Sequence, residues 1–351
     1  MNHLPSVEPF SGEQSFAQDK TLLICAEGFE DRSLAFVKSI KSKIFSEIFL
    51  LTYQPAKKSR LTELKEACNA VSKTEPIIVE YDRFHPTTFE GEFQCKIDNV
   101  LCGVEEIVID ISVMSKLMIH IILVTLRKYV GKIRIIYSEP VDYAPSKETF
   151  DKHSKALRLA TGLPSYGVHD VVRTPKLTSV VMQRSPVIII AFTSFNEQLI
   201  RALLSNLNPT HLFLINGVPP TLSWREAATQ EVHADVLNDY RADNPFGADG
   251  RLVRRTSTLY YAETFELLGD IYRQYCVTNR IVLAPTGSKM QALGCALLKL
   301  CCPDIHIEYP TPETFLPEDY SSPEIKCIHQ VVFTNFCVFI DNLAVESSLN
   351  G

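Results

Sequence analysis

The stretch Arg280-Ile-Val-Leu-Ala-Pro-Thr-Gly-Ser-Lys289 joins a continuous apolar run to a turn that opens a helix. Unbroken apolar runs of this kind are typical of strands buried on both faces, as in parallel sheets sandwiched between helices. The stretch Ile107-Val-Ile-Asp-Ile-Ser-Val-Met-Ser-Lys116 follows the same plan and also ends in serine and lysine. Because a buried strand with a Ser–Lys helix start occurs twice, the sequence predicts two similar α/β units.

Three further segment pairs recur in the same order, at offsets of 160 to 172 residues. The paired segments begin at Ile24 and Ile190, at Tyr137 and Tyr309, and at Val168 and Ile328. In both halves, short apolar runs alternate with amphipathic stretches, which predicts a mainly parallel sheet flanked by helices. We therefore expect an α/β fold of two tandem Rossmann-like lobes that form an internal pseudo-dimer.

The offsets also predict where the lobes begin and end. We expect a flexible leader at 1–19, a first lobe at 20–176, a linker at 177–184, a second lobe at 185–340 and a tail at 341–351. Val168–Thr174 and its counterpart Ile328–Thr334 are each expected to be an extra strand that closes its own lobe.

Composition narrows the classes of function. A chain of 351 residues is long enough for two domains, and its net charge of -6 argues against duplex nucleic acid as the main partner. The apolar run Leu117–Leu126 is too short to cross a bilayer, and the N-terminus lacks signal-peptide features, so we expect a cytoplasmic protein without membrane contact. The ten cysteines show no C-x-x-C spacing and the nine histidines no cluster, so neither a metal nor a cofactor is expected.

The most specific candidate site is Thr286, Gly287, Ser288 and Lys289. Ligands of open parallel sheets bind beyond the carboxyl ends of the strands, near the point where the strand order reverses. Glycine permits close backbone approach, the hydroxyls cap the helix, and its free N–H groups with the lysine attract a phosphate or carboxylate. This is not a Walker A loop, since G-x-x-x-x-G-K-[ST] is absent. A well-capped helix with a surface lysine is the alternative.

The first-lobe copy retains Ser112, Ser115 and Lys116 but lacks the glycine, and it carries Asp110 at the end of the strand. Asp110 has four possible roles: acceptor for a ribose hydroxyl, orienting group for Lys116, general base, or helix cap. The recurrence of serine and lysine at the same junction favours an anion site in this lobe too.

The loop after the first strand supplies a second group of candidates. Gly28 permits close backbone approach, and Arg32 can donate two hydrogen bonds to a phosphate or to Asp110. The corresponding residues of the second lobe are Thr193, Ser194 and Asn196.

The same loops contain aromatic and acidic residues. Phe29 and Phe195 are candidates for stacking on a base, or else for burial beneath their loops. Glu27, Glu30 and Asp31 make the first loop acidic, which fits either a solvated helix start or an acid–base element.

The Pro285–Lys289 junction, with Met290 after it, resembles the CRISPR-associated Rossmann-fold (CARF) domains. Those domains have a Thr/Ser-Gly-Thr/Ser-Lys run after the fourth strand and a polar loop after the first. Ser112–Lys116 matches that pattern only at Ser112, Ser115 and Lys116. Two such units in one chain resemble the SAVED sensors, in which fused CARF-like halves bind one cyclic oligonucleotide. The resemblance implies a nucleotide second messenger as ligand and a role in prokaryotic antiviral defence.

Three functions are compatible with these residues. The first is a sensor that binds a nucleotide and signals to a partner effector protein. The second is an enzyme that cleaves or transfers a nucleotide, with Glu27, Glu30 or Asp110 as base and Lys116 or Lys289 stabilising developing charge. The third is a structural subunit of a defence complex.

Overall fold

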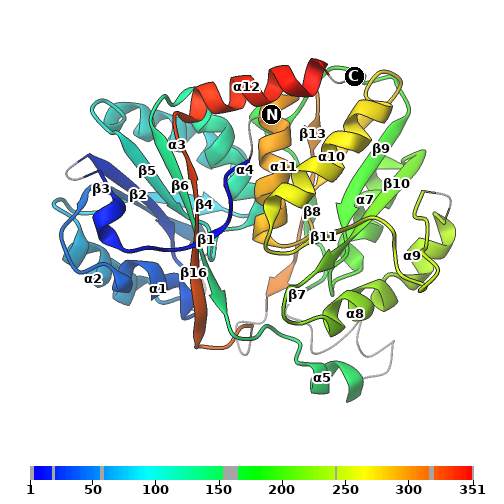
Figure 1. The fold of residues 1–351 in the computed structure, drawn as a ribbon, viewed down its shortest axis with the longest axis horizontal. Helices are drawn as coiled ribbons and strands as arrows, with labels where there is room; N and C mark the ends of the chain where they lie inside the picture. The colour runs from blue at the N-terminus through cyan, green and yellow to red at the C-terminus, as the bar shows by residue number, and fades with distance from the viewer. Residues whose placement is uncertain are drawn as a thin grey trace. The chain divides into compact units, whose positions relative to one another are not determined.

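A computed structural model of the chain describes residues 4–17, 20–55, 59–152, 165–241, 243–315 and 320–349. The chain divides into two compact units (Figure 1). Unit 1 comprises Met1–Tyr143 and Pro317–Asn342, and unit 2 comprises Ala144–Leu316 and Leu343–Gly351. The chain thus enters unit 2 well before the expected linker at 177–184 and later returns to unit 1, so the lobes expected at 20–176 and 185–340 do not coincide with the units.

Unit 1 is built on a seven-stranded sheet in the order β1-β16-β6-β5-β2-β3-β4. Its parallel strands are β2 (Thr21–Ala26), β3 (Phe45–Gln54), β4 (Ile77–Asp82), β5 (Glu106–Asp110) and β6 (Lys132–Pro140). Counted from the β4 edge, the five parallel strands lie in the order β4-β3-β2-β5-β6. The strand order therefore reverses between β2 and β5, where a Rossmann-like sheet binds its ligand.

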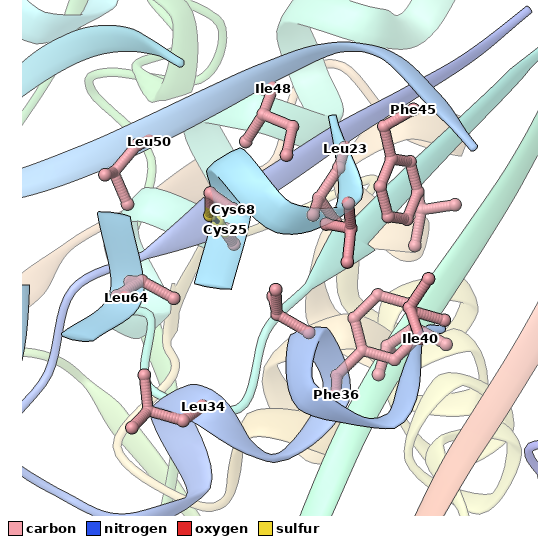
Figure 2. Close-up of a cluster of buried hydrophobic side chains, with 14 of the residues drawn as sticks. Leu23, Cys25, Leu34, Phe36, Ile40, Phe45, Ile48, Leu50, Leu64 and Cys68 are labelled. Carbon is pink, nitrogen blue, oxygen red and sulfur yellow. Dashed lines mark hydrogen bonds between the residues drawn. The ribbon is translucent and has the colours of Figure 1, made fainter. Parts of the chain in front are cut away.

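Helices cover both faces of this sheet, which explains its continuous apolar strands. The helices are α1 (Arg32–Ser39), α2 (Leu61–Val71), α3 (Pro86–Val100) and α4 (Lys116–Thr125). Figure 2 shows Cys68 of α2 beside Cys25 of β2, with Phe36 of α1 in the same buried cluster. On the other face, Phe49 of β3 contacts Phe93 of α3, with ring centroids 6.0 Å apart.

Unit 2 repeats the strand order of unit 1. Its parallel strands are β9 (Val187–Phe192), β10 (His211–Val218), β11 (Arg255–Ser257), β12 (Arg280–Ala284) and β13 (His306–Ile307), in the order β11-β10-β9-β12-β13. Its helices are α5 (Lys147–Lys152), α7 (Gln198–Leu207), α8 (Trp224–Val232), α9 (Ala234–Asp239), α10 (Tyr261–Tyr275) and α11 (Lys289–Cys301). The order reverses between β9 and β12. The predicted α/β class, with parallel sheets flanked by helices, is confirmed; the internal pseudo-dimer stays a prediction.

The last strand of each half of the sequence joins the sheet system of the opposite unit, contrary to expectation. β16 (Ile325–Phe333) pairs antiparallel with β6 in unit 1, beside which it runs in Figure 1. β8 (Asp170–Val172) pairs antiparallel with β14 (Tyr309–Thr311) in unit 2, where β7 (Ser165–Tyr166) also pairs with β15 (Thr314–Phe315). The expectation that each strand closes its own lobe was wrong, because local patterns that are alike do not specify which edge a strand joins.

Both ends of the chain contain regular structure where they are described. β1 (Glu8–Pro9) pairs antiparallel with β16, and the Phe10 ring lies 5.4 Å from that of Phe36, so residues 4–17 are not a loose leader. α12 (Phe336–Leu349) runs through most of the expected tail. Residues 1–3, 18, 19, 350 and 351 lie outside the described part of the chain. Among the described helices, none combines the length and apolar composition needed to cross a bilayer.

Candidate functional site

The two loops that flank the reversal point of unit 1 touch one another. A Cβ atom built on Gly28, in the loop after β2, would lie 3.0 Å from the Cβ atom of Val113, in the loop after β5. The close approach that Gly28 permits is therefore to Val113. The sequence prediction that both loops lie at the same switch point is supported by this contact.

The start of α4 is fixed by a serine cap and two tyrosines. Ser115 Oγ accepts a hydrogen bond from Met118 N at 3.1 Å, as an N-cap does. Ser115 N donates to the Tyr53 hydroxyl at 2.7 Å, and Tyr81 shares a 3.2 Å hydrogen bond with Ser115 Oγ. Sequence reasoning missed both tyrosines. Their place at the carboxyl ends of β3 and β4, on the side of the sheet where the loops carry the candidate residues, is the signal that would have found them.

Lys116 is the first residue of α4 and its side chain is half-buried. Among the described residues, no carboxylate pairs with its ammonium group, and burial alone lowers the pKa of Lys116 from 10.5 to about 8. The charged form of Lys116 therefore lacks a nearby negative charge to stabilise it. An anion at the helix start would supply that charge and raise the pKa.

Asp110 and Ser112 form a buried brace between the ends of β5 and β6. Ser112 donates to the Asp110 carboxylate from its backbone N, at 3.0 Å, and from its hydroxyl. The Ser112 hydroxyl in turn accepts from Ser138 N at 2.8 Å. The helix cap is Ser115 and not Asp110, and the geometry gives Ser112 a structural task.

Glu27 is a buried carboxylate whose two oxygens are both engaged. Oε1 accepts from Tyr53 N at 2.5 Å, and Oε2 accepts from the Ser59 hydroxyl at 2.7 Å. These bonds tie the loop after β2 to the end of β3. A carboxylate engaged in this way is poorly placed to serve as a general base.

Arg32 makes the two-pronged interaction that its position suggested, but with a different partner. Its Nε and Nη2 atoms donate to the two carboxylate oxygens of Glu30, each at 2.8 Å, in a buried ion pair. Its guanidinium carbon also lies 5.5 Å from the ring centre of Tyr143. The side chain therefore braces the loop and contacts neither Asp110 nor open solvent.

The phenylalanines of the two first loops pack against other aromatic rings. Phe29 meets Tyr320 edge to face, at 5.5 Å between centroids. Phe195 is buried and lies 5.6 Å from Phe150 and 6.1 Å from Trp224. For Phe195 the structure favours burial over base stacking.

At the reversal point of unit 2, the loop after β12 touches the end of β9 through a glycine. A Cβ on Gly287 would lie 2.9 Å from the Cβ of Phe192, so only glycine fits there without a shift. Thr286 does not cap the helix. Its hydroxyl donates to Phe192 O at 2.7 Å and accepts from Phe192 N at 2.9 Å, which clips β12 to β9.

Ser288 caps α11 in a complete capping box. Its hydroxyl accepts from Gln291 N at 3.0 Å, while Gln291 Oε1 accepts from Ser288 N at 2.8 Å. The Ser288 hydroxyl also donates to Thr258 O at 2.7 Å. Lys289 follows as the first helical residue and is half-buried. The capping predicted for Ser288 is confirmed.

The remaining second-lobe candidates organise their own loop. The Thr193 hydroxyl donates to Asn216 Oδ1 at 2.6 Å. Asn196 Oδ1 accepts from Gln198 N at 3.2 Å at the start of α7, and Asn196 N donates to the Ser194 hydroxyl at 3.3 Å. These contacts hold the loop in place at the edge of the reversal point.

The candidate site of each unit thus consists of a Ser-capped helix start with lysine at its first position. Within the described residues, no group of three or more His, Cys, Asp or Glu side chains is arranged to hold a metal ion.

No family model matches the chain. No curated protein matches it either. Among solved structures, a short-chain dehydrogenase from Bacillus anthracis str. 'Ames Ancestor' is similar over 83% of this chain and 95% of its own, with 11% identity and a TM-score of 0.20. At that score the likeness supports no inference about function.

Proposed function

We propose that this chain binds a nucleotide second messenger through the phosphate groups, at the Ser–Lys helix start of each unit, and passes the signal to a partner effector in prokaryotic antiviral defence. The observation that carries the phosphate site is the recurrence of Ser115–Lys116 and Ser288–Lys289 at the reversal points of two sheets with the same strand order. The cyclic-oligonucleotide ligand and the effector come from the resemblance to CARF and SAVED proteins.

The charge state of the helix starts supports an anionic ligand. The first N–H groups of a helix lack partners within the helix and carry partial positive charge. In unit 1, the first helical residue is the half-buried Lys116, and no carboxylate of the described residues pairs with its ammonium group. A phosphate fits both features.

The acidic residues favour binding over turnover. Glu27 uses both oxygens to hold the loop, and Asp110 accepts two hydrogen bonds from Ser112. An enzyme would need one of them available to move a proton.

Calorimetric titration with cyclic di-, tri-, tetra- and hexa-adenylate tests the proposal. Lys116→Met and Lys289→Met should each weaken binding of the active nucleotide by about 10- to 150-fold, the worth of a charged hydrogen bond of about 1.5–3 kcal/mol. Lys128→Met is the matched control, because Lys128 is an exposed lysine in the 3-10 helix Leu126–Lys128 that follows the C-terminal end of α4. Equal affinity in all three variants, with the fold intact, would reject the assignment. Intact nucleotide after long incubation separates the sensor from the enzyme.

A further inference from the structure

Each unit packs the segment of chain that has just entered it against the loop after its own first strand. In unit 1 that segment begins after the return from unit 2, and its Tyr320 ring contacts Phe29 at 5.5 Å. The neighbouring Ser321 hydroxyl donates to the Glu30 carboxylate at 2.6 Å. Glu30 is the carboxylate that Arg32 holds, so the incoming segment is bound to the braced part of the loop.

Unit 2 repeats this arrangement with different side chains. The incoming segment begins at Ala144, and its Phe150 ring lies 5.6 Å from Phe195. Arg225 places its guanidinium 4.6 Å from the Phe195 ring centre and donates to the carbonyl oxygens of Ala144 and Pro145, each at 3.0 Å. Here an arginine and two backbone carbonyls do what Glu30 and Ser321 do in unit 1.

The two contacts occupy equivalent places in the repeat. Phe29 and Phe195 lie in the loops after β2 and β9. Each of these strands is the first parallel strand of its unit in chain order and the third of the five parallel strands across the sheet. Phe150 and Tyr320 are about 170 residues apart, within the range of offsets of the other duplicated segments. An aromatic pair between the first loop and the incoming segment is thus a property of the repeated unit.

In unit 1 the same loop also touches the segment that leads into the Ser–Lys helix start, and in unit 2 that segment touches the end of the strand before the loop. In unit 1, Gly28 packs on Val113, whose carbonyl accepts from the Tyr53 hydroxyl that also binds Ser115 N. In unit 2, the glycine lies in the loop after β12, and Gly287 packs on Phe192, the last residue of β9, which directly precedes the loop that carries Phe195. Incoming segment, first loop and helix start are therefore linked by packing in unit 1, and in unit 2 by packing together with the short chain connection from Phe195 to Phe192.

We propose that the Phe29–Tyr320 and Phe195–Phe150 pairs are matched couplers, which link the state of each Ser–Lys helix start to the docking of the segment that arrives from the other unit. When the incoming segment is docked, the helix start opens less often. When a ligand is bound at the helix start, the incoming segment stays docked, since coupling between two sites is reciprocal. β16 follows the incoming segment of unit 1 in the chain, and β8 follows that of unit 2. The helix start of unit 1 is therefore coupled to β16, from the second half of the sequence, and the helix start of unit 2 to β8, from the first half. The ligand-dependent half of this statement rests on the proposed function, and the packing-dependent half does not.

Hydrogen–deuterium exchange of the full-length protein, read by mass spectrometry without ligand, tests the packing-dependent half. Tyr320→Ala should speed exchange by about tenfold or more at residues 111–118 as well as at 325–333, because local opening spreads through contiguous packing. Tyr320→Phe keeps the ring and should leave both regions unchanged. In unit 2, Phe150→Ala should act in the same way on residues 285–291.

Phe339→Ala is the control for a simple loss of packing. Phe339 is half-buried and contacts Phe333, the last residue of β16, at 5.2 Å between centroids. This variant should speed exchange near Phe333 and leave residues 111–118 as they are. If Tyr320→Ala affects only residues 320–333, as a local loss would, the coupling is overturned. Should Tyr320→Ala fail to fold, Tyr320→Leu serves in its place with the same two outcomes.

A second arm uses cyclic tetra-adenylate as the probe, in calorimetry on the same variants. If the wild type binds it, Tyr320→Ala should lower the affinity at least about threefold while Phe339→Ala does not. Equal affinity in the wild type and Tyr320→Ala, together with unchanged exchange at 111–118, would overturn the coupling and leave the nucleotide site standing. Absence of binding to any cyclic adenylate would reject the proposed function, and the exchange arm would then decide the coupling alone.

Discussion

Replacing Lys116 by methionine should make the protein more stable at neutral pH. Methionine retains an unbranched apolar side chain of similar length but carries no charge. In the folded state, burial lowers the pKa of Lys116 from 10.5 to about 8. The folded protein therefore binds this proton more weakly than the unfolded chain does, so keeping the ammonium charged costs stability.

The size of the effect follows from that shift. The difference of 10.5 - 8 = 2.5 units corresponds to about 3.4 kcal/mol at about 1.36 kcal/mol per unit. The side chain is half-buried and not sealed from water, so solvent screening reduces the figure, and we expect about 1–2 kcal/mol. The full cost applies below pH 8, declines as the pH rises from 8 to 10.5, and disappears above that.

Urea denaturation of wild type and Lys116→Met at pH 7 and at pH 10 measures this difference. The variant should be more stable by about 1–2 kcal/mol at pH 7, and the gap should narrow at pH 10. Lys128→Met, at an exposed position in the 3-10 helix that follows α4, should show no such pH-dependent gap. A variant less stable than wild type at pH 7, or a gap independent of pH, would refute the reasoning that Lys116 is desolvated and lacks counter-charge.

Three further substitutions distinguish structural from binding roles. Lys299→Met should destabilise the protein by about 1–3 kcal/mol in the same denaturation assay, because the buried Lys299 ammonium donates to Pro303 O at 2.7 Å and Ile305 O at 2.6 Å and its loss leaves both unpaired. Ser112→Ala should cost about 1–2 kcal/mol and leave nucleotide affinity in calorimetry unchanged, since its hydroxyl braces Asp110 and Ser138 N; a loss of affinity alone would return Ser112 to the ligand site. Gly287→Ala should lower stability by about 1–3 kcal/mol by thermal denaturation, because its Cβ would lie 2.9 Å from that of Phe192; an unchanged Tm would show that the loops separate easily.

The sequence was sufficient for most elements and for both helix starts. Apolar runs such as Ile107–Ile109 predict strands covered on both faces, and serine before lysine after such a strand predicts a capped helix. Both patterns act over short distances along the chain. The strands and the caps at Ser115 and Ser288 therefore agree with the structure.

The features that sequence reasoning missed depend on distant parts of the chain. Ile328–Thr334 and Val168–Thr174 have similar patterns, but the crossings of the chain between units decide which sheet system each joins. The partner of Arg32 was misjudged for a different reason, since Glu30, only two residues away, accepts from both Nε and Nη2 of the guanidinium. Tyr53 and Tyr81 stand at the carboxyl ends of their strands, which marks them as candidates, but their hydrogen bonds to Ser115 depend on the order of the strands in the sheet and were therefore missed.

Proton uptake during nucleotide binding tests the central claim most directly. The measurement is calorimetric titration of wild type and Lys116→Met with cyclic adenylates at pH 8.5, in two buffers of different ionisation enthalpy. A phosphate beside the Lys116 ammonium should raise its pKa above about 8, so the wild type should take up a fraction of a proton on binding and the variant should take up none. Binding with no proton uptake in the wild type, or the same uptake in both proteins, would contradict a phosphate site at this helix start.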